Sequence, residues 1–264
     1  AHSEGLVFVH PYDDPAVIAG QGTLALELLE DAPEIDTLVV PVGGGGLIAG
    51  CAVAATALSP GIEVIGVEVS AYAALAQRLA GAPVSVGGPT IAEGIAVRDI
   101  GAMPLDLIRT HVADVVVVPE HAVEEAIALL AEGAKLIAEG AGAAGVAAML
   151  AYPARFAGRR VATPVCGGNI DARILANVLL RNLLRDGRLL RLVMEIPDRP
   201  GVLADIAGKI GTAGGNIIEV QHQRLFAAPS VQAAQLEVMF EARDAAHGAD
   251  IVRTLEGAYT VNIL

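Results

Sequence analysis

Residues 41–50 read P-V-G-G-G-G-L-I-A-G, and this stretch decides how the rest of the chain is interpreted. It follows an apolar, β-branched segment (37–42) that predicts a strand, and it leads into residues 47–58, which predict a helix. Glycines between a strand and a helix let backbone N–H groups close on an anion, because no Cβ atom intervenes. The pattern predicts a phosphate-binding loop, with a flexible turn as the alternative. Its spacing matches neither a P-loop nor a dinucleotide-binding fingerprint.

The first 187 residues alternate strand and helix patterns. Continuous apolar runs predict strands at 6–9, 37–42, 64–69, 115–118 and 161–165. Segments of helical period predict helices at 22–29, 47–58, 71–80, 121–138 and 141–152. A last helix is expected over 170–184, with Asn169 as its N-cap and Asp186-Gly187 as its stop. Apolar strands separated by helices indicate an α/β fold with a parallel sheet covered by helices on both faces.

The pattern changes after Gly187. Strands are predicted at 189–196, 217–224, 235–241 and 259–263, helices at 202–212 and 245–256, and turns at 197–201 and 214–216. This βαββαβ order is typical of a small ferredoxin-like unit. The sequence therefore predicts two domains, residues 1–187 and residues 188–264.

Composition excludes several classes of protein. No apolar stretch is long enough to span a bilayer, and the net charge of −13 argues against nucleic acid as a partner. Cys51 and Cys166 are far apart in the sequence and are interpreted as thiols in a reducing compartment. We therefore expect a soluble, cytoplasmic protein. Because the chain starts without Met and almost at once enters an apolar run, we also expect it to be part of a longer protein.

A second glycine-rich segment, Cys166-Gly167-Gly168-Asn169, follows the strand predicted at 161–165. The carboxyl ends of parallel strands meet at one crevice, so the thiol of Cys166 could face a ligand there. A small buried residue at a strand end is an equally good interpretation.

Several single residues remain ambiguous. Glu93 and Glu139 lie beside glycines, where a carboxylate is more often a helix cap or a loop charge than part of a site. Glu68 is either a ligand or a solvated strand end, and His10 is interpreted as a loop residue. We find neither a nucleophile arrangement of His, Asp and Ser nor a metal-ligand spacing.

Taken together, these segments resemble the fold-type II pyridoxal-phosphate enzymes, and among them the threonine ammonia-lyases (threonine dehydratases). The matching stretches are 10–15, 19–23, 43–47, 92–97, 139–145 and 166–169. The tail resembles an ACT domain through residues 198–201 and 214–217. An ACT domain after this catalytic region distinguishes the regulated threonine enzymes from the similar serine dehydratases and serine racemases.

The resemblance implies the cofactor pyridoxal 5'-phosphate and a set of residues that bind it. Gly43, Gly44, Gly45, Gly46 and the amide of Leu47 would bind the phosphate. Cys166 would face the pyridine nitrogen as a weak partner, which suits elimination over racemisation. Gly94 would contact the cofactor through its backbone, and Glu139 would lie close to the ring.

The implied reaction is β-elimination of L-threonine, or alternatively L-serine. The product from threonine would be 2-oxobutanoate with ammonia, in isoleucine biosynthesis or threonine catabolism, and the enzyme is expected to be a homo-oligomer. In the family, the Schiff-base lysine and the loop that binds the substrate carboxylate precede the region seen here. Lys135, predicted in mid-helix, and Lys209 do not match that lysine. No catalytic residue is therefore assigned, and this chain alone is expected to be inactive.

Two further expectations concern metals and effectors. Related racemases hold a divalent cation with a carboxylate that matches Glu68, but the later ligand positions are Tyr72 and Ala74 here, so no metal site is expected. In an ACT domain, an amino-acid effector such as isoleucine or valine would bind near Asp198, Gly201, Asn216 and Ile217, where ACT domains pair side by side. A structural turn is the alternative for residues 198–201. For the whole chain, the alternative is an amino-acid-sensing or assembly fragment.

Overall fold

A computed structural model describes residues 7–224 and 232–264 of the chain. The chain divides into two compact units, residues 1–174 and residues 175–264. The division falls within helix α8 (Ala172–Arg185), earlier in the chain than the predicted boundary after Gly187.

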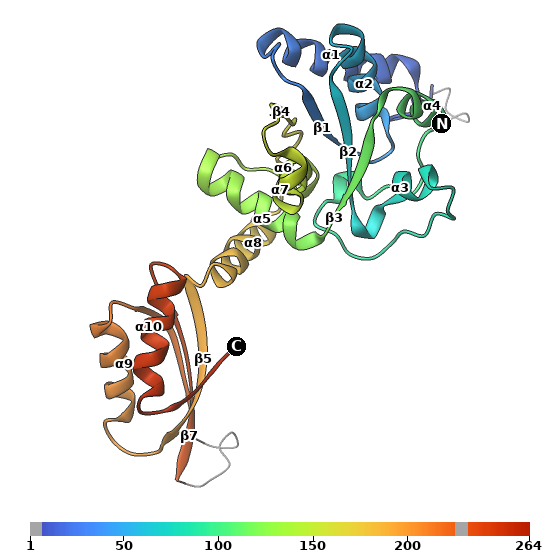
Figure 1. The fold of residues 1–264 in the computed structure, drawn as a ribbon. Coiled ribbons are helices and arrows are strands. Elements are labelled where there is room, and N and C mark those ends of the chain that lie inside the picture. Colours follow the sequence, from blue (N-terminus) through green and yellow to red (C-terminus); the bar gives the residue numbers. More distant parts are fainter. Residues whose placement is uncertain (1–6, 225–231) are drawn as a thin grey trace. The chain divides into compact units, whose positions relative to one another are not determined.

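The first unit is built on a parallel four-stranded sheet in the order β3-β2-β1-β4 (Figure 1). Its strands are β1 (Thr37–Pro41), β2 (Glu63–Val69), β3 (Asp114–Val118) and β4 (Val161–Ala162). All lie where the sequence predicts them, although β4 is shorter than expected. Residues 163–165 have no regular secondary structure, and Thr163 lies against helix α6 (Gly140–Ala151), where a Cβ atom on Gly145 would meet Thr163 Oγ1.

The strand predicted at 6–9 is wrong for the residues that the structure describes. Val7, Phe8 and Val9 have no regular secondary structure and are exposed, and Leu6 lies outside the described residues. An apolar run forms a strand only where a neighbouring strand can pair with it, and no described strand pairs with this one.

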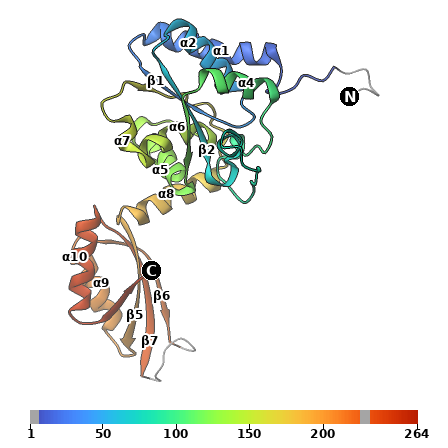
Figure 2. The same ribbon diagram turned by 45° about the vertical axis from the view of Figure 1, so that its right-hand side comes forward.

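Helices cover both faces of the sheet (Figure 2). The helices α1 (Pro15–Asp31), α2 (Gly46–Leu58) and α4 (Ala102–His111) lie on one side, and α5 (Glu120–Leu129) and α6 lie on the other. Successive residues of a strand point to opposite faces. Leu38 and Val40 join a core cluster with Ile48 and Cys51 of α2, whereas Val39, between them, is equally buried on the opposite face. The predicted parallel sheet with helices is confirmed.

Two helices differ from the prediction at their ends. Helix α1 begins earlier than expected, because the Asp14 side chain accepts the N–H groups of Ala16 and Val17 and Pro15 occupies the first turn. The helix predicted over 121–138 stops sooner. It ends as α5, continues as a π-helical turn η4 (Leu130–Ala134) and is terminated by Lys135 in the left-handed conformation, with φ of 58°. Lys135 is therefore at a helix end and not in mid-helix.

Short elements complete the first unit. They are the 3-10 helices η2 (Ser70–Tyr72) and η3 (Glu93–Ile95) and the helices α3 (Ala74–Leu79) and α7 (Pro153–Phe156). The sequence pattern does not predict α4 or α7.

Helix α8 begins and ends with distinct caps. The carboxylate of Asp171 accepts the N–H groups of Arg173 and Ile174 at 2.9 and 3.1 Å, so Asp171 caps the helix and the predicted cap Asn169 is wrong. At the other end, Gly187 has φ of 66° and its N–H group donates to the Leu184 carbonyl. The predicted stop at Gly187 is confirmed.

The second unit is an antiparallel sheet in the order β6-β7-β5-β8 with two helices. Its elements are β5 (Leu189–Pro197), α9 (Val202–Thr212), β6 (Asn216–Gln223), β7 (Ala233–Glu241), α10 (Ala245–Glu256) and β8 (Thr260–Ile263). The βαββαβ order is as predicted. Alternate residues of β5 and β7, among them Met194 and Phe240, pack against Ile206 of α9 and Ile251 of α10.

Candidate active site

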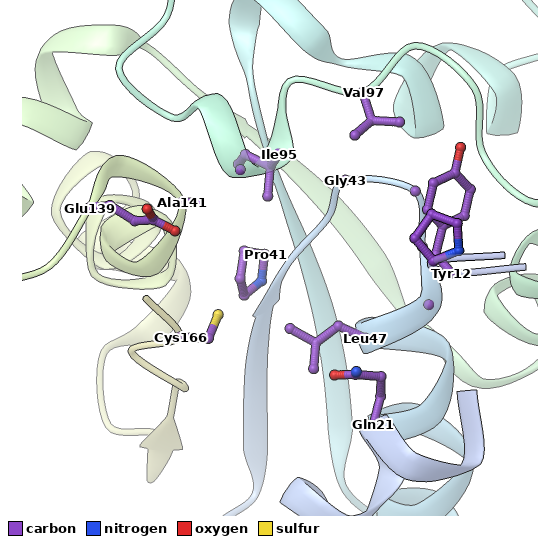
Figure 3. Close-up of a pocket in the computed structure, with 15 residues that line it drawn as sticks. Tyr12, Gln21, Pro41, Gly43, Leu47, Ile95, Val97, Glu139, Ala141 and Cys166 are labelled. Carbon is purple, nitrogen blue, oxygen red and sulfur yellow. The ribbon is translucent and has the colours of Figure 1, made fainter. Parts of the chain in front are cut away.

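A cavity of about 270 Å³ lies at the carboxyl end of β1 (Figure 3). It is lined by Pro11, Tyr12, Gln21, Pro41, Gly43, Gly44, Gly45, Gly46, Leu47, Gly94, Ile95, Val97, Glu139, Ala141 and Cys166. All the residues that the sequence predicts to bind a cofactor are among them. The topology explains this convergence, because the loops that follow parallel strands meet at one edge of the sheet.

The glycine loop, residues 43–47, forms one wall of the cavity and begins helix α2. Gly45 has φ of 94°, a backbone conformation that a side chain would strain, and it serves as the N-cap of α2 without a side-chain hydrogen bond. Within the described part of the chain, no residue accepts the N–H groups of residues 43–47. These donors and the N-terminal end of the α2 dipole make the loop a ready site for an anion such as phosphate.

Cys166 and Glu139 lie on the opposite side of the cavity from the glycine loop (Figure 3). The N–H group of Glu139 donates to the Gly167 carbonyl at 3.1 Å, which ties the start of α6 to the segment after β4. The Glu139 carboxylate lies beside Gly94, since a Cβ atom there would be 3.3 Å from Oε1. Among the described residues, that carboxylate has no hydrogen-bond partner, so it is free to interact with a ligand.

The thiol of Cys166 is half-buried and uncharged at neutral pH. Burial raises its pKa above the ordinary value, and the nearby carboxylate of Glu139 raises it further. Cys166 therefore presents an S–H group, and not a thiolate, to the cavity. The other cysteine, Cys51, lies on α2 and is packed in the hydrophobic core, and burial raises its pKa to about 12.

The segment that brings Gly94 to the cavity is held by residues that the sequence pattern does not single out. The Glu120 carboxylate, in the first turn of α5, accepts the N–H group of Ile91 and the hydroxyl of Thr90. The Thr90 hydroxyl in turn accepts the N–H group of Ala92 at 3.1 Å. These partners are far apart in the sequence, so no local pattern could have revealed them.

Glu68 is not a solvated strand end, because its carboxylate is buried and bound within the protein. It is 1% exposed, and its two carboxylate oxygens accept the N–H groups of Leu75 and Ala76 at 2.7 and 2.8 Å. It therefore caps helix α3. Burial raises the pKa of Glu68, and the hydrogen bonds from the helix partly oppose that shift. The described residues contain no group of His, Cys, Asp and Glu side chains that could hold a metal ion.

The remaining candidates lie in different places. The two lysines do not line the cavity: Lys135 Nζ donates to the Glu132 carbonyl at 2.7 Å, and Lys209 pairs with Asp205 in α9. Exposed Glu93 also lies outside its lining. His10 is a loop residue, as interpreted, and its Nδ1 accepts the N–H group of Asp13 at 2.9 Å.

The residues predicted to bind an effector do not form one site within the second unit. Asp198 and Gly201 precede α9, whereas Asn216 and Ile217 follow it, so a helix about 16 Å long separates the pairs. Asp198 forms an ion pair with Arg224 at 3.1 Å. Asn216 donates from its side chain to Glu241 at 3.1 Å.

None of the helices in the described ranges has the length and apolarity needed to cross a membrane.

Comparisons with known proteins agree on one family. A family model described as pyridoxal-phosphate dependent enzyme matches residues 1–167. The chain is 40% identical over 253 residues to the L-threonine ammonia-lyase of Thermotoga maritima, and the alignment covers 95% of this chain and 63% of that protein. It is similar to the solved structure of maize serine racemase, with a TM-score of 0.62, 36% identity and coverage of 69% of this chain and 58% of that one. For the threonine deaminase of T.th. the TM-score is 0.60 at 38% identity, with 64% of each chain covered.

The alignment with the Thermotoga maritima protein covers the two chains unequally. This chain spans 63%, which is less than two thirds, of the length of that protein. In the other direction, the alignment covers 95% of this chain and therefore extends well into the second unit.

Proposed function

Because the chain belongs to the family of pyridoxal-phosphate dependent enzymes, we propose that it supplies the phosphate-binding side of the active site of a threonine ammonia-lyase. One observation carries the proposal. The glycine loop, with N–H groups that no described residue accepts, lines the same cavity as Cys166 and Glu139. The cavity thus offers donors for a phosphate and, opposite them, a polar wall for a ring.

Each part of the cavity has a role in this proposal. The N–H groups of residues 43–47 would bind the phosphate, and the Cys166 S–H group would be the partner of the pyridine nitrogen. Since this thiol is uncharged, it is a weak partner for that nitrogen. Gly94 would contact the ring through its backbone, and Glu139 would line the same side of the site. Pyridoxal phosphate, when bound, stabilises the negative charge that forms at the Cα atom of an amino-acid substrate.

We propose L-threonine as the substrate. It loses its Cα proton and its β-hydroxyl group as water, and a water molecule then replaces the amino group, which leaves as ammonia and gives 2-oxobutanoate. The names of the Thermotoga maritima and T.th. relatives support this choice. The proposal takes the Schiff-base lysine from outside these residues, since neither Lys135 nor Lys209 lines the cavity. This chain alone should therefore bind the cofactor without catalysing the reaction.

The test uses the chain alone and a fusion. The chain should bind pyridoxal phosphate saturably, in competition with inorganic phosphate, and should form no 2-oxobutanoate from L-threonine. A fusion of this chain behind the N-terminal region of the Thermotoga maritima relative should form 2-oxobutanoate from L-threonine. A fusion that binds the cofactor but converts neither L-threonine nor L-serine would contradict the lyase proposal. Product formation by the chain alone would contradict its proposed inactivity.

A serine-specific enzyme is the second candidate, because the chain is also similar to maize serine racemase. The same fusion separates the two. Preference for L-serine, with pyruvate as the main product, would favour the second candidate over the first.

For the second unit we propose an ACT-type regulatory domain, residues 188–264, that binds isoleucine or valine. Its βαββαβ order supports this. Since Asp198 and Gly201 lie at the other end of α9 from Asn216 and Ile217, one copy cannot surround an effector with both pairs. The proposal therefore places the effector between two copies of the chain, in a homo-oligomer. Calorimetric titration should give heat with isoleucine or valine, and Asn216→Ala should abolish it; a flat titration with both would contradict the proposal.

A further inference from the structure

Tyr12 packs against the glycine loop on the side away from Cys166 (Figure 3). A Cβ atom on Gly44 would lie 2.3 Å from carbon atoms of the Tyr12 ring, and one on Gly46 would lie 2.9 Å from Tyr12 Cα. Neither glycine could carry a side chain unless Tyr12 moved. The aromatic ring is therefore in direct contact with the backbone that presents the N–H donors.

Polar and aromatic contacts fix the position of this ring. The Tyr12 hydroxyl donates to the Asp99 carbonyl at 3.0 Å. The His10 ring lies edge-on to the Tyr12 ring at 4.6 Å, and His10 Nδ1 accepts the backbone N–H group of Asp13. The ring is thus held at its hydroxyl end and along its edge, so it cannot easily rotate away from the loop.

The neighbouring residue ties the same segment to helix α4. The Asp13 carboxylate accepts the N–H groups of Ala102 and Met103, both at 3.0 Å. The N–H group of Gly101, just before α4, donates to the Gly44 carbonyl at 3.1 Å. Residues 10–13, the glycine loop and the start of α4 therefore form a closed set of contacts, in which the ring of Tyr12 packs directly on the loop.

From these contacts we propose that Tyr12 is a positioning residue for phosphate binding. Its ring holds residues 44–46 in the conformation that presents their N–H groups to the cavity, so the donors need little ordering when a phosphate arrives. Donors ordered in advance bind more tightly, because binding then costs less conformational entropy. This inference rests on the proposed function, since its ligand is the phosphate of pyridoxal phosphate.

Variants at Tyr12 separate the contributions of the aromatic ring, the hydroxyl group and the side-chain volume to phosphate binding. Tyr12→Phe keeps the ring, Tyr12→Leu keeps most of the volume, and Tyr12→Ala removes both. The full chain is titrated with pyridoxal phosphate and with pyridoxal, which lacks the phosphate. We expect Tyr12→Ala to raise the Kd of pyridoxal phosphate about tenfold or more, Tyr12→Leu to have an intermediate effect, and Tyr12→Phe to raise it about twofold. The Kd of pyridoxal should change little in all of them.

Tyr152→Phe is a matched control. The Tyr152 hydroxyl also donates to a backbone carbonyl, that of Val117, but this residue does not line the cavity. It should leave both Kd values unchanged. A readout without ligand is amide hydrogen exchange at Gly101 and Ala49, whose N–H groups donate to the loop carbonyls of Gly44 and Gly45. Exchange there should be faster in Tyr12→Ala than in the wild type or in Tyr152→Phe.

The outcomes distinguish the two proposals. If the wild type binds pyridoxal phosphate and Tyr12→Ala binds it equally well with unchanged exchange, the role of Tyr12 is wrong and the proposed function stands. If Tyr12→Ala weakens pyridoxal and pyridoxal phosphate to the same extent, the effect does not act through the phosphate and the inference is also wrong. If the wild type binds neither compound, the proposed function is wrong and the inference falls with it.

Discussion

The two ends of the parallel sheet are built from opposite kinds of interaction. At the amino ends of the strands lies an arginine network, in which every charged group has a partner. Arg155 pairs with Glu63 and Asp114 at 3.0 and 3.1 Å. Arg159 pairs with Asp36 and Glu63 at 3.2 and 2.6 Å, and its Nε also donates to the hydroxyl of Thr37. This network joins the starts of β1, β2 and β3 to the segment that precedes β4.

At the carboxyl ends the glycine loop presents N–H groups that no described residue accepts, and it does so beside a cavity. One end of the sheet is therefore closed by interactions within the protein, and the other keeps its donors for a ligand. Changes at the amino ends should alter stability without altering binding. Changes at the carboxyl ends should above all alter the binding of a ligand in the cavity.

The largest effect is expected from Gly45→Ala. Its φ of 94° is strained for alanine, and the new Cβ atom would lie 2.9 Å from the Pro104 side chain. Strain of this kind costs about 1–3 kcal/mol, and the loop would shift to relieve it. We expect a lower Tm and loss of pyridoxal phosphate binding, measured by thermal unfolding and by titration.

Gly81→Ala is the control for this variant. Gly81 also has a positive φ, of 70°, but a Cβ atom there would meet nothing within 4 Å. It should lower the Tm less than Gly45→Ala and leave cofactor binding intact. Equal loss of binding in both variants would show that the effect is global and would contradict the separation of the two ends.

A smaller effect is expected from Arg159→Ala at the amino ends. This change removes one of the two arginine partners of Asp36 and of Glu63, which keep Arg160 and Arg155, and surface networks of this kind contribute modestly. The Tm should fall by about 2–4 °C, the shift typical of a modest loss in a domain of this size. The Kd of pyridoxal phosphate should stay unchanged. Arg109→Ala, which breaks only the exposed pair with Asp106, should have no measurable effect on the Tm.

The sequence predicts the carboxyl end of the sheet much better than the contacts that surround it. Glycine runs after apolar strands are local signals, and parallel topology brings the strand ends together, so Cys166 and the glycine loop could be placed in one crevice. Helix α4 has no comparable signal. It is capped by the Asp13 carboxylate, far away in the sequence, and an Ala-Met-Pro start gives little local indication. Tyr12 is likewise recognisable only from its contact with Gly44.

Helix ends, too, can be predicted only where the signal is local in the sequence. Gly187 stops α8 through its own backbone conformation, and the sequence predicts it. The end of η4, which continues α5, requires Lys135 in a left-handed conformation, which lysine seldom adopts, so composition favours a longer helix there.

At the carboxyl end of β2, the start of helix α3 has N–H groups that are satisfied by a carboxylate of the protein, that of Glu68. Burial raises its pKa in the folded state above the usual value of 4.5. A raised pKa means that the folded state favours the protonated acid. Its contribution to stability is therefore complete below the unfolded pKa and is lost as the pH rises through the folded pKa.

Glu68→Gln should remove that part of the pH dependence. Urea unfolding at several pH values above 4.5 should show a flatter stability profile than in the wild type, whereas exposed Glu93→Gln should keep the original slope. If the stability of Glu68→Gln changes with pH as steeply as that of the wild type, a group other than Glu68 dominates the pH dependence.

The smallest effect concerns the thiol that faces the glycine loop. Burial is the main reason that the pKa of Cys166 is raised, and the Glu139 carboxylate adds to it. Removing that charge in Glu139→Gln should lower the pKa and increase the thiolate fraction, so alkylation by iodoacetamide at pH 8 should be faster by about twofold to threefold. Fully buried Cys51 should not react in either protein and serves as the internal control. An unchanged rate would mean that Glu139 turns away from the thiol in solution, and the polar wall opposite the phosphate loop would then consist of Cys166 alone.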